Sequence, residues 1–324
     1  RRAKPYSCAV PADPAATALD VVPRRCPVCG SAGGPAIPAN VQEARLGSHS
    51  FASRKVPEYM HWRLVACPRC DTLYADPAPP EAALEAAYAG AAYDSGEAAR
   101  YAAATYASLL PRLLSSTPGG GGALDVGAGD GAFLRELSRA GLDDLAGVEP
   151  SGAALAGAPE DLRELIRPGV FRAEDFEAGR FRLITAFQTL EHLSDPLGFC
   201  RAAHGLLRDG GALAVVCHDR RAPLNRLLGR RSPIFDLEHL QLYSRDSLRV
   251  LLERAGFERI EVRRIVNRYP LRAWARYLPL PERAKRRVLT ALDGPAGAVA
   301  IPMPVGNVAA IGYRGRGARS ARNT

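Results

Sequence analysis

A glycine-rich turn near the middle of the chain carries the clearest chemical signal. The short strand-like run 124–126, Leu-Asp-Val, ends in the turn 127–131, Gly-Ala-Gly-Asp-Gly, and helix-like sequence follows at once. Glycines add no side chain, so such a turn brings backbone N–H groups and a helix N-terminus close to a ligand. A second apolar run, 145–148, ends in Glu149, at the separation expected of an acid that binds a ribose. Together the two features predict a nucleotide-cofactor site.

Two classes of protein use a turn of this kind. Residues 127–132 satisfy the loose G-x-G-x-x-G/A pattern of nicotinamide dinucleotide binding. Asp125 within the strand, Gly131 in the turn and the Val-Glu-Pro-Ser sequence at 148–151 instead resemble motifs I and II of class I S-adenosylmethionine-dependent methyltransferases. The second resemblance is the more specific, because it includes residues outside the turn.

Further motifs follow in the order of that family. The run 181–196 resembles its fourth strand and Leu-Glu-His turn, and 206–217 resembles its helix, Gly-Gly turn and fifth strand. The ordered set favours a methyltransferase over an NAD-dependent oxidoreductase. It implies a Rossmann-like α/β fold, a doubly wound seven-stranded sheet with its last strand antiparallel beside the fifth. We expect the strands at 123–127, 145–149, 169–172, 181–187, 212–217, 257–266 and 306–313.

Composition divides the chain into segments. It opens with Pro- and Ala-rich sequence, continues with paired cysteines, and has a glycine run just before the first expected strand. We therefore expect a disordered N-terminus at 1–24, a small N-terminal zinc-ribbon module at 25–75, a helical lead-in and linker at 76–122, the methyltransferase domain at 123–313 with an insertion at 268–300, and a disordered basic tail at 314–324.

Four cysteines form two pairs of identical spacing. Cys26-Pro-Val-Cys29 and Cys67-Pro-Arg-Cys70 each place two sulfurs three residues apart, so that both can bind one ion. Four thiolates complete a tetrahedral zinc site and leave no open position, so the metal is expected to be structural. The alternatives are disulfides and free thiols, which a reducing cytoplasm disfavours relative to zinc.

The resemblance also implies which residues hold the cofactor. The glycine turn would pass under the methionine part of S-adenosylmethionine, Glu149 would accept both ribose hydroxyls, and 174–176 would reach the adenine. Tyr88 and Tyr93 lie in the lead-in that covers the cofactor in that family. The expected cofactor-binding residues are Asp125, Gly127, Gly129, Gly131, Glu149, Glu174, Asp175, Phe176, Phe187 and Gln188.

Methyl transfer to an alcohol requires a base, and histidine is the usual choice near neutral pH. His239 is the first candidate, because Glu238 is adjacent and can orient it and make it more basic. His192, in the Leu-Glu-His turn, and His218, at the end of the fifth expected strand, follow in that order. A satisfied structural histidine is the commoner case for any one of them; three near predicted strand ends favour a site.

The acceptor is indicated by resemblance alone. The cysteine pairs, His192 and Glu238-His239 resemble deoxysugar C-methyltransferases, which carry a further C-terminal domain. The sequence at 267–274, Asn-Arg-Tyr-Pro-Leu-Arg-Ala-Trp, is similar to methyltransferases associated with cell-surface and secondary-metabolite glycans. We expect O-methylation of a sugar, or of a glycan or secondary-metabolite acceptor, with sugar C-methylation as the alternative.

Two other classes of function are weighed against this. An RNA-modifying methyltransferase would use the zinc ribbon and a basic patch together, but motifs for base N-methylation and C5-methylation are absent, and no nucleic-acid partner is expected. A binding module without chemistry conflicts with the intact glycine turn and Glu149.

The charge of the chain is uneven. The net charge is +9, and 263–287 holds nine Arg or Lys residues against the single acid Glu282. In the structural interpretation this basic stretch is only a solvated face. In the functional interpretation it binds an anionic or lipid-linked acceptor, or makes peripheral contact with a membrane. No apolar run approaches the ~18 residues of a transmembrane helix. The expected location is the cytoplasm, with the inner membrane face as the place of any peripheral contact.

Overall fold

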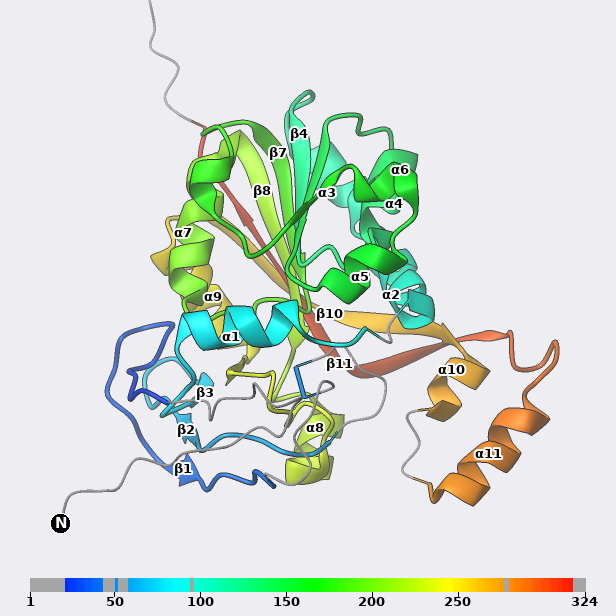
Figure 1. The fold of residues 1–324 in the computed structure, drawn as a ribbon. Coiled ribbons are helices and arrows are strands. Elements are labelled where there is room, and N and C mark those ends of the chain that lie inside the picture. The colour runs from blue at the N-terminus through cyan, green and yellow to red at the C-terminus, as the bar shows by residue number, and fades with distance from the viewer. Residues whose placement is uncertain (1–20, 43–49, 52–57, 94–95, 277–279, 317–324) are drawn as a thin grey trace, which may run out of the picture.

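The computed structural model describes residues 21–42, 50–51, 58–93, 96–276 and 280–316 of the 324-residue chain. The segments expected to be disordered, 1–24 and 314–324, lie mostly outside these residues. Figure 1 shows a large twisted sheet flanked by helices, with a smaller sheet below its strand ends. No helix in the described ranges combines the length and hydropathy needed to cross a bilayer.

The large sheet has seven strands in the order β10-β11-β8-β7-β4-β5-β6. Its five strands from β6 to β8 pair in parallel, and β11 runs antiparallel between β8 and β10. This confirms the Rossmann-like α/β fold, including the antiparallel last strand beside the fifth. The strands are β4 Gly122–Val126, β5 Leu145–Glu149, β6 Ile166–Pro168, β7 Phe181–Phe187, β8 Leu207–His218, β10 Arg259–Pro270 and β11 Ala300–Tyr313.

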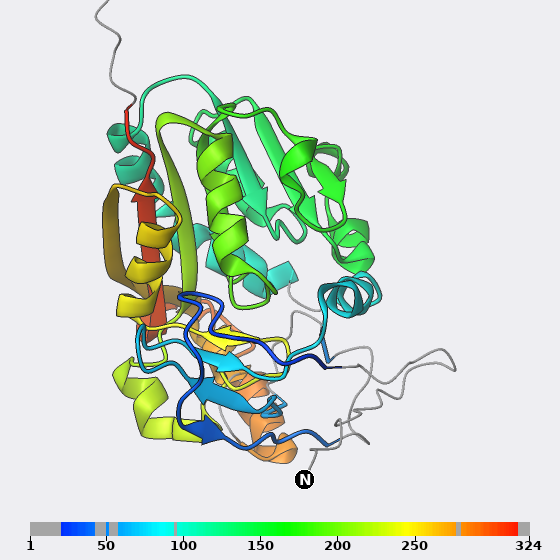
Figure 2. The same cartoon turned by 90° about the vertical axis from the view of Figure 1, so that its left-hand side faces the viewer.

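Helices cover both faces of this sheet. α2, α3 and α4 pack on one face, and α7 and α9 pack on the other, which is turned toward the viewer in Figure 2. The helices are α1 Glu81–Ala89, α2 Gly96–Ala107, α3 Leu110–Ser116, α4 Ala132–Arg139, α5 Gly152–Gly157, α6 Glu160–Arg163, α7 Pro196–Leu206, α8 Pro223–Leu228, α9 Arg245–Arg254, α10 Leu271–Arg276 and α11 Glu282–Ala291.

The sequence of β8 explains why the sheet needs two helical layers. Successive side chains of a strand point to opposite faces. Val215 and Cys217 belong to the core that contains α7 and α9, whereas Ala214 and Val216 belong to the core that contains α2, α3 and α4. Because both sets are apolar and fully buried, each face of the strand must be covered.

The third strand lies earlier than its sequence predicts. We expect a strand at 169–172, but β6 spans Ile166–Pro168 and ends at Gly169, whose φ is +112°. A glycine with this backbone conformation turns the chain away from the extended direction. The expectation was wrong because the apolar residues Val170 and Phe171 belong to a loop that packs on the sheet rather than to a strand.

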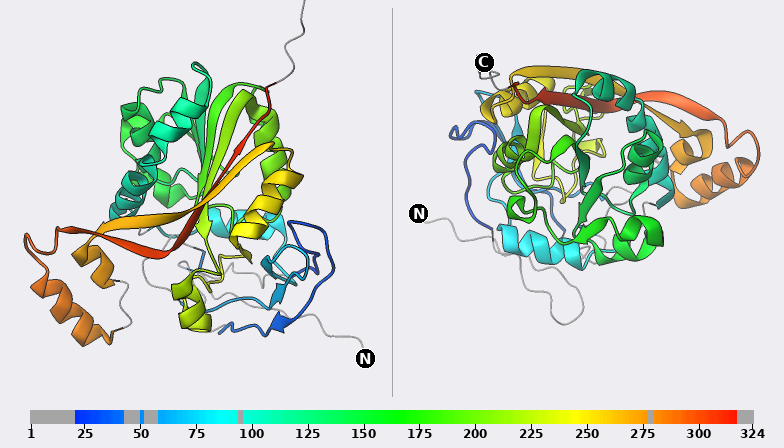
Figure 3. Two further views of the ribbon diagram at one scale, coloured as in Figure 1. Left: turned by 180° about the vertical axis from the view of Figure 1, so that it is seen from behind. Right: turned by 90° about the horizontal axis from the view of Figure 1, so that it is seen from above.

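The interruption at 268–300 is the tip of a long hairpin. β10 continues to Pro270 and β11 begins at Ala300, with the register shifting between Ile265 and Asn267. Beyond that point the two strands leave the sheet together, and the arm carries α10 and α11 at its end (Figure 3, left). The last two strands are therefore longer than the expected 257–266 and 306–313.

The small sheet connects the cysteine module to the C-terminal half of the fold. Its order is β1-β2-β3-β9, formed by Ala36–Ile37, Leu64–Ala66, Leu73–Ala75 and Gln241–Leu242. β3 and β9 pair antiparallel, with Leu73 opposite Leu242. The cysteine module is thus attached directly to the segment that follows Glu238 and His239.

Candidate active site

A cavity of about 1620 Å³ opens at the C-terminal ends of the parallel strands. Ligands of doubly wound folds bind at this edge of the sheet. Its wall includes residues 127–130 of the glycine turn, Glu149 and the end of β7. It also includes all three candidate base residues, His192, His218 and His239. One cavity therefore contains both expected halves of the site.

The glycine turn has the conformation that its residues allow. The φ angles of Gly127, Gly129 and Gly131 are +77°, +58° and +79°, values that favour glycine. A Cβ atom at Gly127 would lie 2.3 Å from Oγ1 of Thr189, and one at Gly129 would lie 3.3 Å from the hydroxyl of Tyr93. Side chains at these positions would close the turn against its neighbours and narrow the cavity.

Glu149 is fixed at the end of β5. Its two carboxylate oxygens accept 2.8 Å hydrogen bonds from the backbone N–H groups of Gly129 and Ser151. Burial raises the pKa of Glu149, and the two backbone donors oppose that shift. The carboxylate is thus held against the glycine turn on the cavity wall, the place that a ribose-binding acid requires.

Asp125 lies deeper, on β4. Its side chain is buried and accepts a 2.6 Å hydrogen bond from the hydroxyl of Thr185 on the neighbouring strand. Burial raises the pKa of Asp125 to about 7, although the bond from Thr185 opposes the shift. Asp125 is also part of the cavity wall.

Of the three residues expected near the adenine, only one lines the cavity. Glu174, in a 3₁₀ turn at Ala173–Asp175, lines the cavity. Asp175 lies 3.7 Å from Arg167, and the ring of Phe176 packs edge-on against Phe181 at 5.5 Å; neither residue is part of the cavity wall. Phe171 forms that part of the wall instead. Sequence reasoning missed it because it was assigned to a strand.

Phe187 and Gln188 lie at the end of β7 and line the cavity, as expected. The ring of Phe187 contacts those of Tyr106 and Phe133 edge-on, at 4.9 and 4.7 Å. Gln188 has a φ of +53° and donates a 3.2 Å hydrogen bond to the hydroxyl of Tyr106. These contacts hold the strand end against α2 and α4.

Three histidines from separate segments of the chain meet in the wall of the cavity. The ring of His239, in the loop before β9, lies 5.1 Å from that of His192 and 5.2 Å from that of His218. His192 follows β7 and His218 ends β8, so the sheet itself brings them together. The structure thus brings the three candidate bases together in one cluster.

Each ring has an identifiable partner on Nδ1. His239 Nδ1 lies 2.9 Å from the carbonyl of Ile234, which can only accept, so Nδ1 carries the proton and Nε2 keeps its lone pair. His218 Nδ1 lies 3.1 Å from Glu191, and His192 Nδ1 lies 3.1 Å from the hydroxyl of Tyr88. Backbone and carboxylate partners of this kind fix the tautomer and orientation of a histidine.

Glu238 has a different partner from the one its sequence suggests. We expect it to orient its neighbour His239, but its carboxylate lies 3.8 Å from Nδ1 of His192. The carbonyl of Ile234 orients His239 instead. A carboxylate oxygen of Glu238 lies within 4.8 Å of a ring nitrogen of His239, but the hydrogen bond that orients His239 comes from the backbone.

Glu191 is the acid that sequence reasoning missed. Its side chain is fully buried and accepts bonds from both the backbone N–H of His218, at 2.7 Å, and its ring. Burial favours the neutral acid, but the hydrogen bond from His218 and the charges of the surrounding histidines lower the pKa of Glu191 to about 2. The signal was present in the Leu-Glu-His turn, where the histidine drew attention and its neighbour did not.

Burial keeps two of the histidines neutral. It lowers the pKa of His192 to about 3 and also lowers the pKa of His239 below its usual range. Mutual repulsion among the rings adds to the shift, whereas the charge of Glu191 opposes it. Both rings are therefore uncharged at neutral pH, so each has one nitrogen free to accept a proton.

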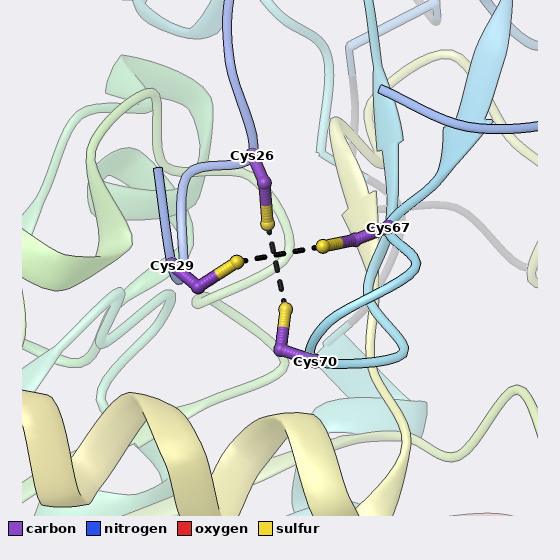
Figure 4. A group of neighbouring side chains, drawn as sticks. All are labelled: Cys26, Cys29, Cys67 and Cys70. Atoms are coloured by element: carbon purple, nitrogen blue, oxygen red, sulfur yellow. Dashed lines mark hydrogen bonds between the residues drawn. The ribbon is translucent and has the colours of Figure 1, made fainter. Parts of the chain in front are cut away.

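The four paired cysteines converge, as Figure 4 shows. Sγ of Cys26 lies 3.5 Å from that of Cys70, and Sγ of Cys29 lies 3.4 Å from that of Cys67, too far for disulfides. Around a zinc ion with Zn–S bonds of ~2.3 Å, tetrahedral sulfurs would lie ~3.8 Å apart. The cluster is compatible with that geometry.

One further group in the described chain has ligand atoms close enough to hold a metal. His192, Glu238 and His239 bring theirs within 4.8 Å of one another. Nδ1 of His192 already bonds the hydroxyl of Tyr88 and Nδ1 of His239 already bonds a carbonyl, so only the Nε2 atoms remain as nitrogen donors.

The sheet order, glycine turn and following acid define a Rossmann-type cofactor domain. A family model for the methyltransferase domain matches residues 98–262, just over half of the chain. The chain belongs to this methyltransferase family, whose members use S-adenosylmethionine.

Curated relatives match a shorter stretch. The ubiquinone biosynthesis O-methyltransferase of Methylococcus capsulatus is 34% identical over 97 residues, 28% of this chain and 40% of the relative. The enzyme of the same name from Pseudomonas paraeruginosa is 29% identical over 117 residues, 33% of this chain and 49% of the relative. The match thus spans less than half the length of either relative.

Solved structures align over more of the chain at lower identity. The YcgJ protein of Bacillus subtilis is 19% identical, covers 65% of this chain and 99% of its own, and has a TM-score of 0.45. A methyltransferase from Archaeoglobus fulgidus is 13% identical, with coverages of 65% and 94% and a TM-score of 0.44.

Proposed function

We propose that this chain is an S-adenosylmethionine-dependent O-methyltransferase that acts on a hydroxyl of a sugar or related polyhydroxylated small molecule. The observation that carries the proposal is the cluster of His192, His218 and His239, which shares one cavity with the glycine turn and Glu149. The names of the curated relatives, O-methyltransferases of ubiquinone biosynthesis, support transfer to oxygen.

The size of the cavity supports two ligands. Pockets for one drug-sized molecule measure roughly 300–1,000 Å³. The cavity here measures about 1620 Å³, which leaves room for an acceptor beside the cofactor.

Bound S-adenosylmethionine would supply an electrophilic methyl group. Glu149 offers a fixed carboxylate for the ribose hydroxyls, and residues 127–130 of the glycine turn line the cavity where the methionine part would lie. Phe171 and Phe187 provide apolar wall on this side. These residues would hold the cofactor by burial and hydrogen bonds, so that the acceptor meets a fixed methyl group.

On the acceptor side, His239 takes the hydroxyl proton. Its Nδ1 proton is committed to Ile234, which leaves Nε2 as the acceptor, and its lowered pKa keeps that nitrogen free at neutral pH. Nε2 of His239 would accept the proton of the acceptor hydroxyl while the oxygen takes the methyl group, and the electron pair of the broken methyl–sulfur bond would remain on the sulfur of the cofactor. A positioned base contributes roughly 10²- to 10⁴-fold to such a step.

Glu191 stabilises the charge that this transfer creates. It is ionised and buried below the histidines, so an imidazolium ion formed there meets an opposite charge in a low-dielectric environment. His192, held by Tyr88 and near Glu238, is the second group able to accept or relay the proton.

One part of the cavity wall, formed by residues of β10, α10 and β11, has both polar and apolar side chains. Asn307 donates a 3.0 Å hydrogen bond to Asn267, which in turn donates to the hydroxyl of Tyr269. Trp274 stacks on Tyr269 with ring centroids 4.7 Å apart. This wall suits an acceptor with a hydroxylated head and an apolar portion.

We also propose that Cys26, Cys29, Cys67 and Cys70 hold one structural zinc ion. All four ligand positions are thiolates, so the site offers no place for substrate or water.

Two measurements test the enzymatic proposal. Calorimetry should show binding of S-adenosylmethionine and none of NAD. Incubation with labelled cofactor and a panel of nucleotide sugars, glycolipids, phenols and amines should label a hydroxylated acceptor, with the methyl group on oxygen by mass spectrometry. Binding of NAD instead of the methyl donor, or labelling confined to amines or carbon, would overturn it.

A further inference from the structure

Helix α8 exposes an unusual number of apolar side chains. Leu224, Leu227 and Leu228 are 40%, 83% and 36% exposed, and Leu227 is the most exposed large hydrophobic residue that the described chain contains. Single exposed leucines are common on soluble domains, but three within five residues form a patch. The patch lies at the surface where α8 projects, at the lower end of Figure 1.

The segment around these leucines is strongly basic. Residues 220–231 contain five arginines and no acid. Arg220 and Arg221 bind Asp71, whereas no ion pair within the described chain joins Arg226, Arg230 or Arg231 to a carboxylate. Three exposed leucines beside three unpaired arginines match the chemistry of an anionic lipid surface, with an apolar interior below a negative layer.

The exposure is not caused by a loosely held helix. The buried side chain of Asn225 donates a 2.8 Å hydrogen bond to the carbonyl of Asp219 and accepts a 2.9 Å bond from the hydroxyl of Ser232. Gly306 lies so close that a Cβ there would be 2.6 Å from the Asn225 amide. The inner face of α8 is therefore fixed, and Leu227, which is 83% exposed, is carried on a rigid support.

The same segment borders the cavity. Leu224, Leu228, Arg230 and Arg231 are part of its wall, as are His218 and His239. A surface seated on α8 would therefore meet an opening to the acceptor side of the site.

The basic arm lies at this end of the molecule as well. α8 and α11 both lie below the strand ends in Figures 1 and 2 and in the left view of Figure 3. Arg286 and Arg287 of α11 are exposed. One flat surface can therefore approach α8 and α11 from the same side.

We infer that α8 and the following turn, residues 223–231, dock on an anionic lipid bilayer, with Leu227 entering the interface and Arg226, Arg230 and Arg231 meeting the phosphates. Docking in this way would present the cavity to amphiphilic acceptors held in the bilayer, a consequence that rests on the proposed function. Residues 223–231 carry three unpaired arginines and no acidic residue, and this uniform positive charge favours an anionic lipid surface over a protein partner.

Sedimentation with vesicles tests the docking without any assay of activity. The full chain should pellet with phosphatidylglycerol-containing vesicles, bind pure phosphatidylcholine vesicles weakly, and release at high salt. Leu227→Asp should weaken the partition coefficient by roughly tenfold or more, because it removes an apolar anchor and adds repulsion. Arg230→Ala/Arg231→Ala should reduce both binding and its salt dependence. Val266→Asp, a change at an exposed aliphatic residue of β10 away from α8 and α11, is the matched control and should bind normally.

A second variant reports on insertion directly. Leu227→Trp should shift its fluorescence to the blue on addition of anionic vesicles and be quenched by brominated lipids. Three results would overturn the inference: no binding to anionic vesicles, binding that Leu227→Asp leaves intact while Arg286→Ala/Arg287→Ala abolishes it, or concentration-dependent self-association that Leu227→Asp removes. Failure of methyl transfer alone would leave these readouts unchanged, so the two proposals can fail separately.

Discussion

Asp71, the residue after the last of the four clustered cysteines, accepts a 3.0 Å hydrogen bond from Nε of Arg221, three residues beyond His218. Arg220 binds the same carboxylate and also donates a 2.8 Å bond to the Asp71 carbonyl. The cysteine module is thus joined to the loop that leaves the histidine cluster, and β3–β9 pairing joins it again behind His239. A change in the conformation of the cysteine module should therefore shift the residues around His218 and His239.

The first prediction concerns zinc. Protein purified without added metal should contain one zinc ion per chain, and Cys67→Ser should lose it together with stability on the order of 4 kcal/mol, because the remaining thiolates no longer close the site. Elemental analysis and urea denaturation measure the two effects. Asp71→Asn is the matched variant: it should keep zinc yet raise KM for the acceptor, because only the link to Arg220 and Arg221 weakens. Full stability in zinc-free protein would contradict the assignment.

The second prediction concerns Glu149. Glu149→Ala should weaken binding of S-adenosylmethionine by about 1.5–3 kcal/mol, the value of hydrogen bonds to a charged group, and should leave the acceptor KM nearly unchanged. Calorimetry measures the affinity. Glu174→Ala changes an exposed acid on the same wall and should have a much smaller effect. Equal losses in the two variants would show that Glu149 has no special role at the ribose.

Some of this site was predictable because its residues are close in the chain. Asp125, the glycine turn and Glu149 lie within 25 residues and follow from strand, turn and next strand in order. The cysteine pairs were equally readable, because spacing alone brings two sulfurs of each pair to one point.

Other features depend on contacts that spacing does not encode. Glu191 meets His218 only because β7 and β8 are neighbours, and Ile234 meets His239 only through the shape of a loop. Phe171 rather than Phe176 reaches the cavity because Gly169 ends the strand early. In each case the deciding interaction joins segments whose relative position is set by tertiary packing.

The third prediction concerns Asp125 and pH. An unfolded aspartate titrates near 3.9, whereas the folded value of its pKa is about 7, so the folded state holds this proton more tightly. The stability that the proton confers is complete below the unfolded pKa and is lost as pH rises through 7, with a slope of up to ~1.4 kcal/mol per pH unit. Relative to Asp125→Asn, the wild type should therefore become less stable between roughly pH 4 and pH 7.

Urea denaturation at several pH values measures this difference. The side chain that Asp125→Asn introduces is not charged at any pH, and its amide oxygen can still accept from Thr185, so the variant isolates the proton. Thr185→Val is the control: it removes the bond that favours the carboxylate and should move the transition to higher pH. Parallel stability curves for wild type and Asp125→Asn would show that the carboxyl ionises as it does in water.

The last prediction concerns the base. His239→Ala should lower kcat by roughly 10²- to 10⁴-fold and leave cofactor affinity unchanged, because the cofactor is expected to be held by Glu149 and the glycine turn rather than by His239. Since the pKa of His239 lies below its usual range, wild-type kcat should stay level as pH falls from neutrality to about 6.5 and decline only below that value. Glu191→Gln should weaken turnover as well, because the buried charge that stabilises the imidazolium is gone. His192→Ala is the matched comparison: a larger loss there, with near-normal turnover in His239→Ala, would move the base to His192, whose pKa of about 3 would place the decline in kcat at a much lower pH.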